Sequence, residues 1–265
     1  MSHSRLTLAL RVFAAFIALS VLGVSAEAKS RGTKIEPGEA KQIGHGTATS
    51  WVEVKKDGTP VSIGVTFDKE ALSGLPAEDT EYTLALPKSS VTGFQLIGVN
   101  WNPHGHIPPG IYDVPHFDFH FFLIGPEQRD EITATGSNLD TVRKPPSAEY
   151  VPKDYIFAPG SEFPQEGSHW IDPNSPEFHG QPFTATFIYG TYNGMIDFVE
   201  PMVTKKFFET DPSVKRAVKL PQAYQKTGYY PDKYSVHYDK AVGKYTVAIR
   251  GLRLRQAAAG RTTGY

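Results

Sequence analysis

The 265-residue chain contains no cysteine. Disulfide bonds, thiolate metal sites and thiol catalysis are therefore excluded together. A chain without disulfides depends on its hydrophobic core for stability, and 40% apolar residues with 12% aromatic residues are enough to build one. This composition fits a secreted or envelope protein that folds without covalent cross-links.

An excess of charge of either sign is also lacking, because 27 basic and 28 acidic residues give a formal net charge of −1. Such a balance provides no electrostatic attraction to nucleic acid or to an anionic membrane. The sequence has no G-x-S-x-G motif, P-loop or dinucleotide fingerprint either. We therefore expect no nucleic-acid partner, and serine-hydrolase and nucleotide-binding functions have little support.

Long hydrophobic runs are missing as well. The apolar run at residues 12–24 is shorter than the ~20 residues that a transmembrane helix needs. Arg5 and Arg11 lie on its N-terminal side, and Ala-Glu-Ala at residues 26–28 resembles a cleavage site. The pattern predicts a secretory signal peptide at residues 1–28 and a secreted or periplasmic protein that is free of the membrane after cleavage. An uncleaved membrane anchor is the alternative.

The rest of the chain consists mostly of short segments typical of strands, separated by turn residues. Asp57-Gly58 and Asn193-Gly194 are strong hairpin turns. The expected strands are residues 46–54, 60–67, 81–86, 94–101, 183–191, 195–203, 234–238 and 245–254. We predict a mainly β fold, an antiparallel barrel or sandwich with a few short helices and long loops.

The same pattern predicts the organisation of the chain. After the signal peptide, residues 29–42 resemble a flexible leader, and residues 43–256 are predicted to form a single β-rich domain. A flexible tail is expected at residues 257–265. No repeat of fixed period is visible.

The highest density of metal-binding side chains lies between His104 and His120. This segment, HGHIPPGIYDVPHFDFH, holds four of the nine histidines together with Asp113 and Asp118. Imidazole and carboxylate groups are preferred ligands of divalent metals, and they are also the usual acids and bases near neutral pH. Core packing does not require such a density, so we expect a functional site here.

Alternation along the predicted strand places His116, Asp118 and His120 on one face, where they form a polar stripe, with phenylalanines on the other. Positions i and i+4 of a strand are about 13 Å apart, so the two strand histidines cannot share one ion unaided. A Pro- and Gly-rich turn holding His104 and His106 can fold back toward them. These five residues are predicted metal ligands; the alternative is a hydrogen-bonded histidine stack without an ion.

His169 is predicted to join this site from a distant segment. It lies within residues 158–181, which are rich in Pro, Gly, Ser and Asn and resemble a loop too long for mere connection. We predict that this loop delivers His169 to the polar stripe as a further metal ligand.

Glu200 is predicted to join it from the Asn193-Gly194 hairpin. If that pair is the two-residue turn, Glu200 lies opposite Phe187 on an aromatic face, where an exposed acid is unexpected. A one-residue slip of register would turn Glu200 to the other face. We predict a catalytic role for Glu200 as a general base acting on a metal-bound water, with direct ligation as the alternative.

The longest motifs resemble a known family. They are WNPHGHIPPGIYDVPHFDFHFF, GSHWIDPNSPEFHGQPFTATFIYGTYNGMIDFVEPMVT and GYYPDKYSVHYD. Over residues 46–255 the chain resembles the secreted bacterial family of unknown function called TTHB-two-ten-like. Similar sequences read P-x-M-G-x-H-W before the H-W pair, whereas this chain has Glu166 in place of the methionine. The resemblance implies a β-rich secreted domain, allows for a homo-oligomer, and implies no reaction.

Two functions remain open from the sequence. In the first, the protein binds a divalent metal, with zinc expected first and manganese or iron as alternatives, and is a metal-dependent enzyme if a bound water is activated. In the second, it is a non-catalytic binding or oligomeric assembly module whose His/Asp stripe is structural. The sequence indicates no particular small-molecule ligand.

Overall fold

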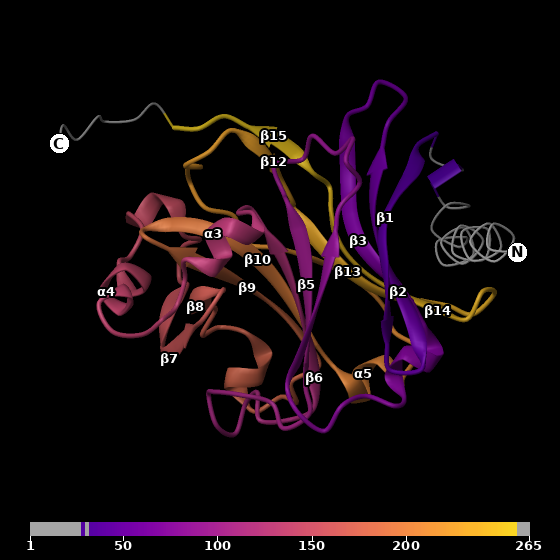
Figure 1. Ribbon diagram of the computed structural model, residues 1–265, viewed down its shortest axis with the longest axis horizontal. Helices are drawn as coiled ribbons and strands as arrows, with labels where there is room; N and C mark the ends of the chain where they lie inside the picture. The colour runs from indigo at the N-terminus through magenta and orange to yellow at the C-terminus, as the bar shows by residue number, and fades with distance from the viewer. Residues whose placement is uncertain (1–27, 30–31, 259–265) are drawn as a thin grey trace, which may run out of the picture.

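The computed structural model in Figure 1 describes residues 28–29 and 32–258. The predicted signal peptide, apart from Ala28, and most of the predicted C-terminal tail lie outside these residues. Both therefore stay predictions. Within the described part of the chain, no helix is long and apolar enough to cross a membrane.

The described residues form mainly antiparallel strands. The strands are β1 (Lys34–Ile43), β2 (Gly46–Val54), β3 (Pro60–Asp68), β4 (Thr80–Ala85), β5 (Leu96–Asn102), β6 (His116–Phe122), β7 (Ile156–Phe163), β8 (Gly167–Ile171), β9 (Ala185–Tyr192), β10 (Met195–Thr204), β11 (Ser213–Ala217), β12 (Gly228–Tyr230), β13 (Lys233–Asp239), β14 (Lys244–Arg250) and β15 (Arg253–Arg255). The helices are α3 (Pro126–Asp130), α4 (Asn138–Arg143) and α5 (Lys205–Phe208), with short 3-10 turns η1 (Lys69–Leu72), η2 (Ala148–Tyr150) and η3 (Pro176–His179).

Two large sheets make up the fold. One has the strand order β1-β2-β3-β14-β13-β11 and the other β4-β5-β6-β10-β9-β8-β7, while β12 and β15 form a small third sheet. The large sheets pack against each other through one shared hydrophobic core (Figure 1). The predicted β class and the sandwich alternative are confirmed. The barrel alternative is wrong, because neither large sheet pairs its first strand with its last.

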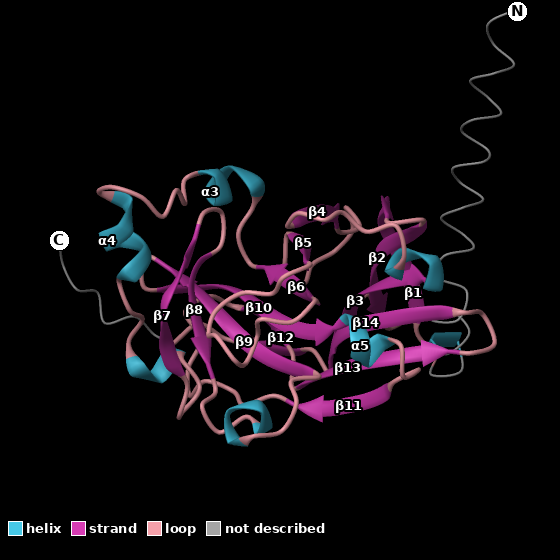
Figure 2. Ribbon diagram, turned by 90° about the horizontal axis from the view of Figure 1, so that it is seen from below, coloured by secondary structure: helices cyan, strands magenta, loops and turns pink. Residues whose placement is uncertain are grey.

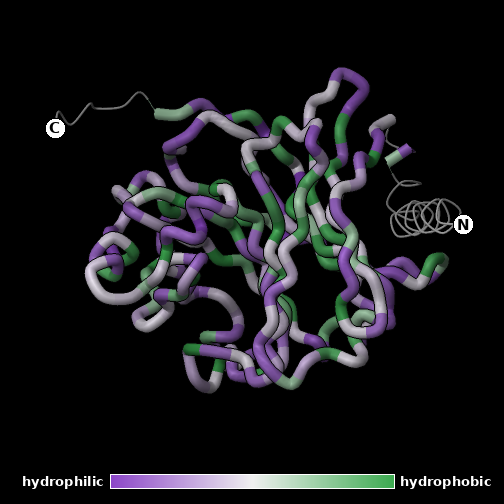
Figure 3. Tube along the Cα trace, in the orientation of Figure 1, coloured by the Kyte–Doolittle hydropathy of each residue, from purple (hydrophilic) through white to green (hydrophobic). Residues whose placement is uncertain are grey.

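The core between the two large sheets is strongly aromatic. Phe117, Phe119 and Phe121 of β6 all belong to it, and the ring of Phe119 lies 6.2 Å from that of Phe67 on β3. Hydrophobic segments gather in the central strands, and hydrophilic ones are common in loops and hairpin tips (Figure 3). Because side chains alternate along a strand, the polar residues of β6 point to the opposite face of their sheet, as the sequence predicted.

That opposite face is covered by the long connections on either side of β6. One small apolar cluster joins Phe122 on the sheet to Ile132 from the connection that follows β6. Another joins Met202 on the sheet to Tyr112 from the connection that precedes β6 and to Phe183 from the connection between β8 and β9. Helices α3 and α4 and strands β7 and β8 lie at the end of the molecule away from β1, β2 and β3 (Figures 1 and 2). The polar residues of β6 are therefore enclosed.

The predicted flexible leader at residues 29–42 is wrong for most of its length. Residues from Lys34 onward form β1, which pairs with β2 at the edge of the six-stranded sheet and is irregular between Pro37 and Ala40. Proline, charged residues and a bulge are typical of edge strands, and the same features resemble a linker in the sequence. At the other end, the backbone N–H of Ala258 donates to the Tyr224 carbonyl, 2.8 Å away.

The predicted loop at residues 158–181 is also wrong in its central part. It contains the end of β7 and the whole of β8, and His169 lies on β8, directly opposite Gly190 of β9. The pairing of β7 with β8 is interrupted between Phe157 and Glu162. Proline and glycine within that interruption hide the strand pair from a sequence pattern.

The predicted register of the Asn193-Gly194 hairpin is correct at the turn and wrong beyond it. Tyr192 pairs with Met195 as expected, but the register shifts between Ile196 and Phe198. Glu200 therefore lies opposite Ile188 and not opposite Phe187. One inserted residue turns every later side chain of β10 to the other face. Glu200 thus joins the face that carries the histidines.

Candidate metal centre

Metal-ligating side chains converge in two groups along β6. The loop group consists of His106, His116 and Asp118, and the buried group consists of His120, His169 and Glu200. In each group, one ligand atom from every residue lies within 4.8 Å of the others. His116 and His120 belong to different groups, in agreement with their separation of about 13 Å along an extended strand.

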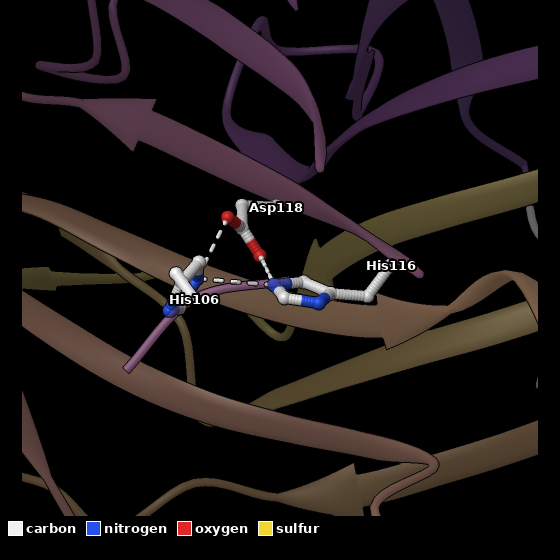
Figure 4. Close-up of side chains that lie close together, drawn as sticks. All are labelled: His106, His116 and Asp118. Atoms are coloured by element: carbon white, nitrogen blue, oxygen red, sulfur yellow. Dashed lines mark hydrogen bonds and ion pairs between the residues drawn. The ribbon is translucent and has the colours of Figure 1, made fainter. Parts of the chain in front are cut away.

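The three side chains of the loop group point toward one another (Figure 4). Nε2 of His106 lies 3.3 Å from Oδ2 of Asp118, and Nε2 of His116 lies 3.2 Å from Oδ1. The two Nε2 atoms are 3.0 Å apart. Asn102 of β5 pairs with His116 on the neighbouring strand β6. It donates its side-chain N–H to Asp118 Oδ2 at 2.6 Å. Both carboxylate oxygens are thereby oriented.

The turn that carries His106 folds back over β6, as the sequence predicted. His106 donates its backbone N–H to the Tyr112 carbonyl at 3.1 Å. Gly105 makes this approach possible, because it has φ +68° and a Cβ there would lie 2.1 Å from the Tyr112 oxygen. The glycine of the H-G-H motif is therefore a structural requirement for placing His106.

Backbone carbonyls determine which nitrogen of each loop-group histidine carries hydrogen. Nδ1 of His106 donates to the Ile107 carbonyl at 2.8 Å, and Nδ1 of His116 donates to the Val114 carbonyl at 2.7 Å. A carbonyl only accepts, so in each neutral ring Nε2 bears the lone pair. Two lone pairs 3.0 Å apart repel each other unless a proton or a metal ion lies with them.

Electrostatics of the loop group favour a cation. Burial lowers the pKa of His106, but the hydrogen bond and negative charge of Asp118 outweigh burial and raise the pKa to about 9. Burial would raise the pKa of Asp118, yet the two histidines hold it well below its usual value. Without a metal, a proton on His106 therefore stabilises the group.

The buried group is assembled from three strands and is almost fully enclosed. His120 and Glu200 are each 1% exposed, and His169 is 6% exposed. Nε2 of His120 lies 3.4 Å from Oε2 of Glu200, and Nε2 of His169 lies 3.8 Å from the same oxygen. The Phe198 ring packs against both imidazoles and over Gly190, where a Cβ would lie 2.0 Å from a ring carbon.

A further carboxylate beside the buried group, that of Glu166, was not predicted to join the site. It precedes β8, and its Oε2 lies 3.5 Å from Nε2 of His169 and 3.9 Å from Nε2 of His120. Its other oxygen accepts a hydrogen bond of 3.0 Å from the Asn100 side chain. The departure from the methionine of similar sequences is the sequence feature that could have identified Glu166.

The buried group is not held together by hydrogen bonds. Both ring nitrogens of His120 and the Oε2 atom of Glu200 lack a hydrogen-bond partner among the described residues. Separations of 3.4 to 3.9 Å exceed the usual N–H···O length of about 2.9 Å. They are close to the distance between two ligands of a tetrahedral metal site, which is about 3.4 Å when each ligand lies ~2.1 Å from the ion. Nδ1 of His169 donates to the Ser161 carbonyl at 2.8 Å, which leaves its Nε2 free to bind.

Burial disfavours every charged form in the buried group when no cation is bound. It raises the pKa of Glu200 well above its usual value and that of Glu166 to about 8. It lowers the pKa of His120 well below its usual value and that of His169 to about 4. A divalent cation at the centre would reverse the effect on the carboxylates, since it stabilises their ionised form.

The structure separates the predicted ligands into three sets. All of these residues were predicted to belong to one site. The structure divides most of them between two sets, the loop group and the buried group. The prediction that His169 and Glu200 join the polar stripe is confirmed, since one ligand atom of each lies within 4.8 Å of a ring nitrogen of His120. His104 forms the third set, because it is exposed and belongs to neither group.

Comparison with known families gives one match. Residues 56–101 match the family model TTHB210-like, described as hypothetical protein TTHB210. This is the family whose resemblance the sequence motifs indicated, and the match covers β3, β4 and most of β5. Comparisons with curated proteins and with solved structures give no match. The family description names no activity.

Proposed function

We propose that the protein binds a divalent metal ion at the buried group, with His120, His169, Glu200 and Glu166 as ligands. The observation that supports this most strongly is the meeting of His120 Nε2 and Glu200 Oε2, which are buried and have no hydrogen-bond partners among the described residues. Leaving such atoms unpaired costs about 1–3 kcal/mol each, and more for a charged group. A metal ion would satisfy all four ligands at once.

The alternative is a structural network of hydrogen bonds without an ion. The loop group fits it in part, since a proton on His106 Nε2 could be donated to Asp118 Oδ2, but Asp118 Oδ1 has no hydrogen-bond partner among the described residues. The buried group argues against it, because each imidazole Nε2 lies 3.4 to 3.9 Å from the two facing carboxylate oxygens. These separations suit atoms that share a metal ion better than atoms that share a proton.

Zinc is the first candidate for the buried group. Two imidazoles and two carboxylates are ligands that zinc accepts in a tetrahedral site, with manganese or iron as alternatives. Four protein ligands would leave a tetrahedral ion without an open position, which favours a structural role over catalysis. Of the two roles predicted for Glu200, direct ligation is therefore the one proposed.

Elemental analysis of protein purified without chelators tests the proposal. We expect a stoichiometric divalent metal, strongly reduced in His120→Ala and His169→Ala while the β-type circular dichroism is retained. His104→Ala is the matched control, because His104 is exposed and outside both groups, and its metal content should equal that of the wild type. A wild type that contains no metal and takes up no added zinc, manganese or iron would overturn the proposal.

We further propose a secreted or periplasmic location, which the signal-peptide pattern at residues 1–28 supports. N-terminal sequencing of protein recovered from the medium or the envelope should give a first residue near Glu27 or Lys29. Intact Met1 in a membrane fraction would contradict it.

A further inference from the structure

We propose that the loop group is a second metal position, separate from the buried group and open on one side, which holds an exchangeable divalent first-row ion with a non-protein ligand. The inference goes beyond the proposed function and rests on its own three residues. It does not require the buried group to be occupied.

The ligands of the loop group are held in place before any ion arrives. Each imidazole is anchored through Nδ1 to a backbone carbonyl, so its Nε2 points toward Asp118. Asn102 orients the carboxylate from the neighbouring strand. Groups that hydrogen-bond to the ligands without touching the ion are typical of metal sites. They set both the tautomer and the direction of the imidazole. A proton between the two Nε2 atoms is the competing occupant.

The three ligand atoms are spaced for one ion and occupy only part of its coordination sphere. The two Nε2 atoms are 3.0 Å apart, and the nearest Asp118 oxygen is 3.2 Å from His116 Nε2 (Oδ1) and 3.3 Å from His106 Nε2 (Oδ2). These separations lie in the range that adjacent ligands ~2.1 Å from a metal span. No fourth histidine, aspartate or glutamate among the described residues belongs to the group. The His106 side chain is 25% exposed, whereas that of His116 is 0% exposed. Solvent therefore reaches the group from the side of His106.

The two groups do not share a ligand. Asp118 contacts both histidines of the loop group, whereas Glu166 directs Oε2 to the buried group and accepts a hydrogen bond from Asn100 on its other oxygen. The buried group has two carboxylates to offset a divalent charge, and the loop group has one. An ion in the loop group would retain a net positive charge, so it should bind more weakly and attract a water or a small anion to its open side.

Titration of metal-free protein with Co²⁺, followed by visible absorption and by equilibrium dialysis, tests the second position. We expect two ions per chain, the second with a Kd at least about tenfold higher than the first. His106→Ala and His116→Ala should lose the weaker event and keep the tighter one. His120→Ala should lose the tighter event and keep the weaker, and His104→Ala should keep both.

The open side is tested by adding azide to the Co²⁺-loaded protein. Azide should change the absorption of the wild type and of His120→Ala, and leave that of His106→Ala unchanged. His106→Ala is the safest variant for folding because the residue lies in a turn and is the most exposed of the three. Circular dichroism of each variant checks the fold.

The outcomes separate this inference from the proposed function. One ion per chain that survives in both His106→Ala and His116→Ala overturns the second position and leaves the buried centre standing. One ion that is lost in those variants and retained in His120→Ala supports the loop group and overturns the buried centre. Two ions that are both unaffected by His106→Ala and His116→Ala also overturn the inference.

Discussion

The two faces of β6 are equally buried but chemically opposite. One face carries Phe117, Phe119 and Phe121, which pack into the core between the sheets. The other carries His116 and His120 with a carboxylate between them, beneath the connecting segments. Burial stabilises the first face directly, because apolar area leaves water. The second face gains nothing from burial unless its polar atoms find partners.

The partners differ along the polar face. In the loop group, hydrogen bonds to carbonyls and to Asn102 satisfy both Nδ1 atoms and Oδ2 of Asp118, while Oδ1 has no hydrogen-bond partner among the described residues. In the buried group, His120 and Glu200 lack such partners among the described residues. Enclosing a polar stripe can therefore leave buried nitrogen and oxygen atoms without hydrogen-bond partners, and a bound cation can satisfy them.

The aromatic face should carry more stability than any single polar residue. Phe119→Ala should lower the free energy of unfolding by about 3–5 kcal/mol, because it removes a fully buried ring and leaves a cavity. Urea unfolding measures the loss, and Phe119→Leu is the control with a smaller one. Metal content per folded chain should not change; a loss of metal in Phe119→Ala would show that the two faces are coupled.

Metal binding at the buried group should stabilise the folded chain by mass action. With free zinc at 100 times Kd, the free energy of unfolding should rise by about 2.7 kcal/mol relative to chelated protein. Urea midpoints with and without zinc measure the difference, and His169→Ala should show a much smaller one. Equal midpoints for wild type with and without zinc would contradict a metal that binds only the folded state.

Removal of one carboxylate from the buried group should weaken the tighter metal event. Glu166→Gln should raise its Kd at least about tenfold, about 1.4 kcal/mol, because one negative charge leaves the ion. Competition with a chromogenic chelator measures the change. Glu131→Gln, at an exposed glutamate outside both groups, should match the wild type. An unchanged affinity in Glu166→Gln would remove Glu166 from the ligand set.

Metal-free protein should lose stability as the pH rises from 6.5 to 9. Glu166, with its pKa raised to about 8, stabilises the fold fully below its usual 4.5 and loses that contribution as the pH rises through 8. His106, raised to about 9, contributes fully below 6.5 and loses its contribution through 9. His169, lowered to about 4, opposes this trend only below 6.5.

Urea unfolding in chelator across this pH range measures that dependence. Glu166→Gln should flatten the part between pH 6.5 and 8. A stability that rises over the same range would show that the two residues ionise in the opposite sense to the one expected.

The smallest effect is expected at His104. His104→Ala should change the free energy of unfolding by less than about 0.5 kcal/mol, since the side chain is exposed and belongs to neither group. Thermal unfolding and metal analysis together measure this. A clear loss of metal would mean that the turn brings His104 to the loop group in solution.

Much of the candidate site was predictable from local sequence. The alternation HFDFH separates ligands from core residues without any knowledge of the partner strands, and the H-G-H turn predicts the return of His106. The face of Glu200 was not predictable, because a single inserted residue near Phe198 decides it. The role of Glu166 was missed because its ligand partners come from other strands.

The sequence by itself determined the β class, the positions of the hairpin turns, the two-faced character of β6 and the kinds of ligand available. These properties depend on side-chain period and residue type, which act over a few neighbouring residues. Only the tertiary structure decided that His169 lies on a strand, that Glu200 faces His120 and that the ligands divide into two groups. Those outcomes depend on strand pairing and bulges that join residues far apart in the chain, and one shift of register reverses which side chains meet.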